Sequence, residues 1–101
     1  MRKSEFWDEV ENALGSVGRL RILRVLTEHP HRQYTKYTLK RKTGLSSKEL
    51  ERQIRTLIEI GWVEEYPHRP RTYRANLKKT PVKLAAEFLR RLKEENFKKP
   101  G

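Results

Sequence analysis

The sequence predicts a mostly helical α+β fold, and three observations support it. Apolar residues recur at helical spacing in four segments, 4–14, 17–28, 47–60 and 82–97. Two short segments rich in aromatic and β-branched residues, 62–66 and 72–76, are typical of a β-hairpin. The length of 101 residues suits one hydrophobic core. We therefore expect residues 1–101 to form one domain, with an N-terminal helix (1–15), a core (16–77) and a C-terminal helix (80–97).

The charge balance points to an anionic partner. Lys and Arg number 24 against 13 Asp and Glu, a formal net charge of +11. Residues 67–101 hold eleven basic and three acidic side chains, net +8. Nucleic acid is the first candidate partner, and an anionic membrane surface is the second.

Several classes of protein are disfavoured by composition. The absence of cysteine excludes disulfides and thiolate metal sites, and we expect no metal and no cofactor. No signal peptide is evident, and no apolar run approaches the roughly 20 residues of a membrane span. We expect a cytoplasmic protein, and the abundance of Glu, Lys and Arg would suit a thermophile.

The first helix is predicted from Ser4, as its cap, to Leu14. Phe6, Val10 and Leu14 fall on one face at helical spacing, with Trp7 at its edge. This face is covered either by the chain's own core or by a second chain. A helix that carries Phe and Trp outside the core favours the second chain.

The second helix, 17–28, is the predicted central element of the core. Ser16 caps it, apolar residues occupy most of its circumference, and Pro30 ends it. His29 and His31 flank this proline, but two imidazoles without a third ligand are a weak metal signal. We interpret them as residues of an ordinary loop.

Residues 34–60 have the pattern of a helix-turn-helix. Tyr34 and Thr35 fit a short strand, Thr35 can cap the helix 36–43, and Gly44 supplies a left-handed turn residue. Ser46, with Glu49 three residues later, forms the capping-box pattern that starts a helix at Ser47. In such motifs the second helix enters the DNA major groove.

The helix 47–60 has a basic outer face. At 100° per residue, Lys48, Arg52 and Arg55 lie within an arc of about 60° opposite the apolar stripe. Taken alone, this pattern fits the solvated side of any amphipathic helix. The preceding turn, the net charge and the basic loop that follows favour contact with the groove.

Two further segments complete the prediction. The hairpin tip, 67–71, contains two prolines and carries Arg69 and Arg71, which suits a phosphate backbone or a minor groove; an ordinary charged tip is the alternative. Thr80 and Pro81 predict the start of a final helix from residue 82 to residue 97. Its apolar face is wide enough to contact two surfaces. The predicted dimer interface comprises Phe6, Trp7, Val10, Leu14, Ala85, Phe88, Leu89 and Leu92.

The segments LGSVGRLRILRVL, TGLSSKELERQIRTLIEIGWVEE and PRTYRAN resemble winged-helix transcription regulators of the ArsR and MarR kind, particularly small archaeal ones. The resemblance spans residues 14–77. It implies a winged helix-turn-helix with extra N- and C-terminal helices, in which the recognition helix and the wing (residues 67–71) bind double-stranded DNA and the terminal helices form a homodimer. The DNA-binding residues so implied are Lys36, Lys40, Arg41, Ser46, Ser47, Lys48, Arg52, Arg55, Arg69 and Arg71.

The chain departs from this family pattern at two places in the helix 36–43. Lys40 and Thr43 stand where a small and an aliphatic residue are usual, so we expect looser packing or a rotation that lets Lys40 reach solvent. The cysteines of ArsR-type metal sensors are absent. The terminal helices are shorter than those beside which MarR-type proteins bind effectors, so neither form of control is implied.

Three functions compete at this point. The first is a homodimeric transcription regulator with sequence preference. The second is a non-specific architectural DNA-binding protein, and the third is a winged helix for protein–protein interaction that docks through Phe6, Trp7 and Phe88. Membrane association through the helix 82–97 is weaker, since its outer face mixes both charge signs. We expect no enzyme, because no phosphate loop and no grouped nucleophile and base are evident.

Overall fold

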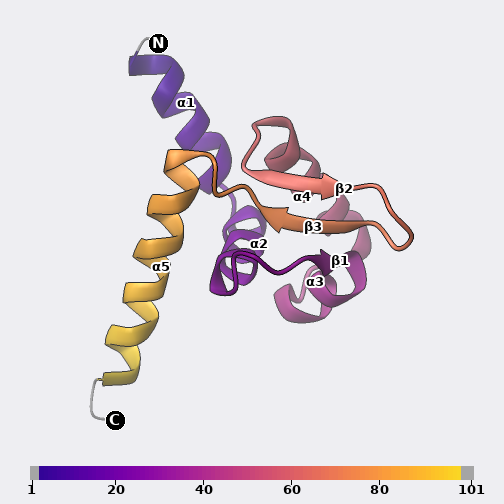
Figure 1. The fold of residues 1–101 in the computed structure, drawn as a ribbon. Coiled ribbons are helices and arrows are strands. Elements are labelled where there is room, and N and C mark those ends of the chain that lie inside the picture. Colours follow the sequence, from indigo (N-terminus) through magenta and orange to yellow (C-terminus); the bar gives the residue numbers. More distant parts are fainter. Residues whose placement is uncertain (1–2, 99–101) are drawn as a thin grey trace.

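A computed structural model describes the backbone of residues 3–98 and the side chains of residues 7–95. The elements run in the order α1 (Lys3–Leu14), α2 (Val17–Glu28), β1 (Tyr34–Thr35), α3 (Lys36–Thr43), α4 (Ser47–Glu59), β2 (Val63–Tyr66), β3 (Thr72–Ala75) and α5 (Thr80–Lys98) (Figure 1). This order confirms the predicted α+β, mostly helical class.

The helix α2 is the centre of the fold, as its apolar circumference predicted. It packs against α1, α3, α4, α5 and β3. Ile22, Leu23 and Leu26 on this helix are fully buried. The hydroxyl of Ser16 caps its first turn by accepting a hydrogen bond from the amide of Arg19 at 3.3 Å.

A three-stranded antiparallel sheet has the order β1-β3-β2. Tyr34 of β1 lies opposite Tyr73 of β3, and Val63 of β2 lies opposite Ala75. Because β1 leads directly into α3, the sheet joins the β2–β3 hairpin to the first helix of the helix-turn-helix.

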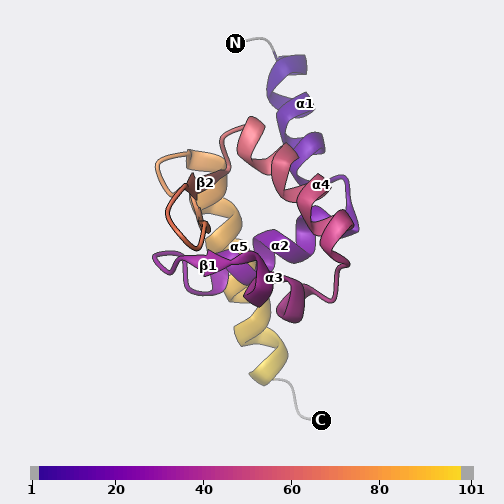
Figure 2. The same ribbon diagram turned by 90° about the vertical axis from the view of Figure 1, so that its right-hand side faces the viewer.

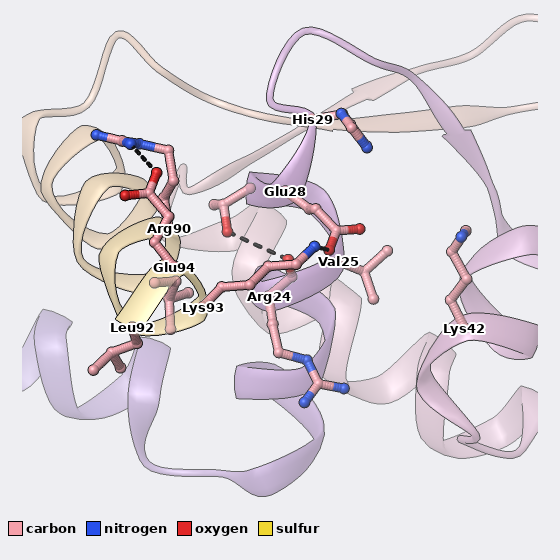
Figure 3. A pocket seen from close by; sticks show the side chains of 11 residues that line it. Arg24, Val25, Glu28, His29, Lys42, Arg90, Leu92, Lys93 and Glu94 are labelled. Atoms are coloured by element: carbon pink, nitrogen blue, oxygen red, sulfur yellow. Dashed lines mark hydrogen bonds and ion pairs between the residues drawn. The ribbon is translucent and has the colours of Figure 1, made fainter. Parts of the chain in front are cut away.

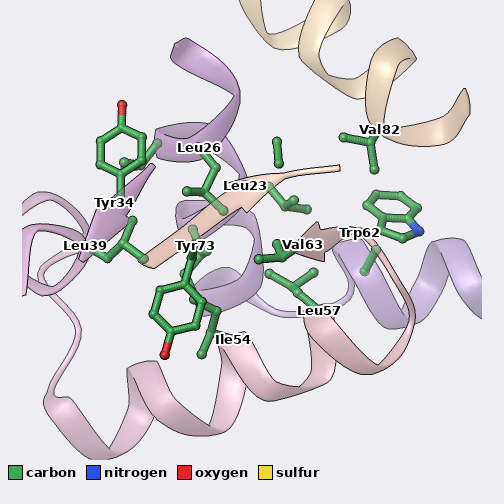
Figure 4. Close-up of a cluster of buried hydrophobic side chains, with 14 of the residues drawn as sticks. Leu23, Leu26, Tyr34, Leu39, Ile54, Leu57, Trp62, Val63, Tyr73 and Val82 are labelled. Carbon is green, nitrogen blue, oxygen red and sulfur yellow. The ribbon is translucent and has the colours of Figure 1, made fainter. Parts of the chain in front are cut away.

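The core lies between α2, α4 and the sheet (Figure 4). Trp62 and Tyr73 are its largest fully buried side chains, packed with aliphatic residues such as Leu23 and Ile54. Full burial of an apolar side chain of this kind contributes about 1.5–3 kcal/mol. The indole nitrogen of Trp62 donates to Glu9 Oε2 at 2.9 Å, which fastens α1 to the core.

The terminal helices extend beyond the core in opposite directions (Figures 1 and 2). The predicted starts of both helices are wrong by one or two residues. The helix α1 begins at Lys3, so Ser4 lies inside it. The helix α5 begins at Thr80, because the carbonyl of Lys79 accepts the amides of Val82 and Lys83 at 3.1 Å and takes the capping place expected of Thr80. Within residues 3–98, no helix combines the length and the apolar character needed to cross a bilayer.

Candidate nucleic-acid interface

The turn between α3 and α4 fixes the direction of α4. Gly44 has φ +75°, and its amide donates to the carbonyl of Lys40 at 3.0 Å. Leu45 packs against the core. The Ser46 hydroxyl then accepts the amide of Glu49 at 3.1 Å, so α4 starts at Ser47 as predicted.

The two residues of α3 that depart from the family pattern find different environments. Lys40 is exposed, which confirms that it reaches solvent. Thr43 is buried, and its hydroxyl donates to the carbonyl of Leu39 at 2.7 Å and accepts the amide of Leu45 at 3.3 Å. A satisfied hydroxyl can occupy a core position at little cost. Leu39 beside it is fully buried, so α3 is firmly seated.

The helix α4 separates an apolar face from a basic one. Leu50, Ile54 and Leu57 are fully buried. Arg52, on the opposite side, is 72% exposed, and among the described residues its side chain bonds only to Glu49 one turn earlier, at 2.6 Å. Lys48 is exposed and has no hydrogen bond or ion pair to any described residue. Exposed pairs of this kind are worth about 0–1 kcal/mol, so both cations can exchange water or a carboxylate for a ligand.

Five charged residues form an ion-pair network beside this face. Glu51 of α4 binds both Lys36 at the start of α3 and Arg55, the latter at 3.2 Å. Glu65 of β2 lies 3.7 Å from Arg55 and 3.5 Å from Arg71. The network therefore ties α3, α4 and the hairpin together, with three cations and two carboxylates.

The network remains charged at neutral pH. The hydrogen bond from Lys36 lowers the pKa of Glu51, and the same contact raises the pKa of Lys36. Glu51 likewise raises the pKa of Arg55. The formal charge of the five-residue network is thus +1, on side chains that are partly open to solvent.

The two arginines of the wing differ in their ion pairs. Arg69 is exposed and has no hydrogen bond or ion pair within the described residues, whereas Arg71 belongs to the network. The Arg69–Pro70 peptide bond is cis. At the base of the hairpin, Arg74 binds Glu64 at 3.2 Å and lies over the ring of Tyr66.

The structure thus brings together only some of the predicted DNA-binding residues. Lys36, Arg55 and Arg71 share carboxylates, and Ser46, Ser47, Lys48 and Arg52 lie at the start and along the outer face of α4. Lys40 and Arg41, in the last turn of α3, stand outside the network.

Sequence reasoning missed Glu51 and Glu65. The spacing of Glu51 four residues before Arg55 was a usable signal. Nothing in the sequence pattern marked Glu65.

The residues of the predicted dimer interface differ in their exposure to solvent. Trp7, Leu14, Phe88 and Leu92 are exposed, and Phe88 has 61% of its surface open to solvent. Val10, Ala85 and Leu89 are half-buried within the chain itself. The side chain of Phe6 lies outside the described residues. The exposed members sit on α1 and α5, away from the hairpin tip (Figure 1).

A cleft of about 830 Å³ separates the end of α2 from α5 (Figure 3). Val25, Leu89 and Leu92 form its apolar part. An ion pair between Glu28 and Lys93 joins the two helices. Among the described residues, no group of three His, Asp or Glu side chains gathers in a way that could hold a metal ion.

These elements define a class: the fold is a winged helix-turn-helix, with α3 and α4 as the helix-turn-helix and the tip of the β2–β3 hairpin as the wing. A solved structure of this class is similar to the chain: the homodimeric winged helix-turn-helix DNA-binding domain (fragment 1–100) of Mb0332 from Mycobacterium bovis, described as a possible ArsR-family transcriptional regulator. The TM-score is 0.66 at 22% sequence identity, over 95% of this chain and 88% of that one. No family model and no curated protein matches the sequence.

Proposed function

We propose that this protein is a homodimeric transcription regulator that binds double-stranded DNA with a sequence preference. The observation that carries the proposal is the exposed basic face of α4, which Lys48 and Arg52 form opposite a fully buried stripe. The similarity to a domain described as homodimeric and DNA-binding supports it.

In this proposal α4 is the recognition helix and lies in the major groove. The planar fork of Arg52 suits the two acceptors of a guanine edge, and Lys48 and Arg55 reach neighbouring bases or phosphates. The amide groups at the start of α4, near Ser46 and Ser47, favour a phosphate. The remaining backbone contacts come from Lys36, Lys40, Arg41, Arg69 and Arg71.

The dimer forms through α1 and α5, which carry the exposed Trp7, Phe88 and Leu92. Two recognition helices would then meet successive major grooves about 34 Å apart, which requires a palindromic site. We infer one domain, 1–101, with the terminal helices as its dimerisation part. A regulator of this kind acts in the cytoplasm, at the nucleoid.

Selection of bound sequences from a random duplex pool tests the proposal. A palindrome with half-sites one helical turn apart is the expected result. A gel shift at low salt that finds no binding to any duplex would overturn it.

Two substitutions distinguish the recognition of bases by Arg52 from the contact of Arg69 with the DNA backbone. Arg52→Ala should relax the preference at one base position, at a cost of about 1–3 kcal/mol for the preferred sequence. Arg69→Ala, the matched change in the wing, should weaken all sequences alike and reduce the salt slope by about 1. Equal effects of the two variants on preferred and random duplexes would contradict these roles.

One observation favours the architectural alternative. Residues 67–101 hold eleven basic and three acidic side chains, so the positive charge extends well beyond α4 and the wing. Competition with bulk genomic DNA decides between the two, because an architectural protein binds every sequence with equal affinity. The protein-interaction alternative depends on the exposed Trp7 and Phe88. Monomers in light scattering together with weak DNA binding would favour it.

A further inference from the structure

A small pocket of about 320 Å³ lies between the start of α3 and the wing. Its lining residues are Thr35, Lys36, Tyr37, Pro70, Arg71 and Tyr73. Two of them, Lys36 and Arg71, are cations that come from different DNA-facing elements. Each is paired with a carboxylate, Lys36 with Glu51 and Arg71 with Glu65.

The hydroxyl of Tyr73 is an independent sign of a missing partner. Its side chain is fully buried, and the ammonium of Lys36 donates to the hydroxyl oxygen, but no described residue accepts from the O–H. Buried polar groups are nearly always paired, so an exception calls for an explanation. Burial raises the pKa of Tyr73 and the nearby ammonium of Lys36 lowers it, so the phenol is a neutral donor beside a cation.

The place of the pocket in the fold indicates which anion it takes. With α4 in the major groove and the wing at the adjacent minor groove, one sugar–phosphate strand passes between them. Lys36 and Arg71 stand at that crossing, since Glu51 links Lys36 to α4 and Arg71 ends the wing. Cationic side chains beside a hydroxyl donor suit a phosphate oxygen.

We propose that this pocket receives one phosphate of the DNA backbone, which Lys36 and Arg71 hold jointly and the Tyr73 hydroxyl supports as a third donor. Glu51 and Glu65 are positioning residues, because they hold the two cations at the pocket before DNA arrives. The inference rests on the proposed function and adds to it a single phosphate that α3 and the wing share.

The salt dependence of binding tests whether the phosphate is shared. Each phosphate neutralised contributes about 0.9 to the slope of log K against log salt concentration. The double variant Lys36→Gln and Arg71→Gln should therefore lose about 0.9. Each single variant should lose less, because the remaining cation still neutralises the shared phosphate. Fluorescence anisotropy on one duplex measures these slopes. The control pair Lys40→Gln and Arg69→Gln, from two separate places, should lose about 1.8 when combined. A loss of about 1.8 in the Lys36 and Arg71 double variant would refute the shared site.

Tyr73→Phe tests the hydroxyl without changing the ring. The thermal midpoint should change little, because the buried O–H that is removed has no acceptor, while the dissociation constant for DNA should rise about tenfold. Tyr34→Phe is the matched control, since Tyr34 is buried opposite Tyr73 in the sheet but does not line the pocket. If the Tyr73→Phe variant binds DNA like the parent, the Tyr73 hydroxyl is not a donor to the phosphate.

Two further results distinguish failure of the shared phosphate site from failure of the proposed function. Titration of the free protein with inorganic phosphate should show no saturable binding; saturation would show that the pocket serves a free anion instead of the backbone. If the parent protein binds no duplex, the proposed function itself fails. A parent that binds DNA with Lys36 and Arg71 acting on separate phosphates contradicts only the inference.

Discussion

Replacing Ser46 with alanine should weaken the fold through the start of the recognition helix. The Ser46 hydroxyl accepts the amide of Glu49 at 3.1 Å, and this bond satisfies one of the free amides in the first turn of α4. Loss of such a cap costs about 1 kcal/mol, within a range of about 0.5–2. In a domain of about 100 residues, 1 kcal/mol lowers the thermal midpoint by roughly 4–8 °C. Thermal unfolding followed by far-ultraviolet circular dichroism measures this shift.

Two companion variants separate stability from DNA binding. Ser47→Ala changes the exposed neighbour, whose hydroxyl makes no hydrogen bond to any described residue, so its free energy of unfolding should stay within about 0.5 kcal/mol of the parent. Ser46→Asp keeps a capping oxygen and places a negative charge at the positive end of the helix, so it should stay stable. The same charge repels phosphate, so DNA affinity should fall. Equal thermal midpoints for the two alanine variants would refute the cap, and unchanged DNA affinity of Ser46→Asp would refute a phosphate at this helix end.

Three more predictions concern the turn, α5 and the dimer. Gly44→Ala should cost about 1–2 kcal/mol in chemical denaturation, because φ is +75° and the surrounding space is open. Arg90 and Arg91 lower the pKa of Glu87 to about 2, so its stabilising effect is present above the unfolded pKa near 4.5 and is lost as the pH falls towards 2; Glu87→Gln should flatten the dependence of the thermal midpoint on acid. Phe88→Glu should give monomers in light scattering without unfolding the chain, because Phe88 is exposed; a dimer that persists would exclude this surface.

The elements could be predicted from the sequence because their signals are local. The caps Ser16, Thr35 and Ser46 each act on an amide three residues away, and Gly44 acts on its own backbone. Apolar spacing placed α2 at the centre for the same reason, since a helix that is apolar over most of its circumference must be covered on all those sides.

The arrangement of charges could not be predicted in the same way. Glu51 meets Lys36 only because α3 and α4 pack together at that point, and Glu65 meets Arg55 only because β2 packs beside α4. Both contacts depend on the tertiary packing, about which helical spacing says nothing. The start of α5 was misplaced because the carbonyl of Lys79, a backbone group without a sequence signature, begins that helix.

The positions of the two tryptophans give this protein two optical reporters of different events. Trp62 is fully buried and hydrogen-bonded to Glu9, so its emission follows the docking of α1 on the core. Trp7, nearer the start of α1, is 57% exposed, so its emission follows whatever covers that helix. A Trp7→Phe variant would leave the signal of Trp62 alone. Comparison of the parent protein with the Trp7→Phe variant across a dilution series then distinguishes folding from assembly by fluorescence, without any attached label.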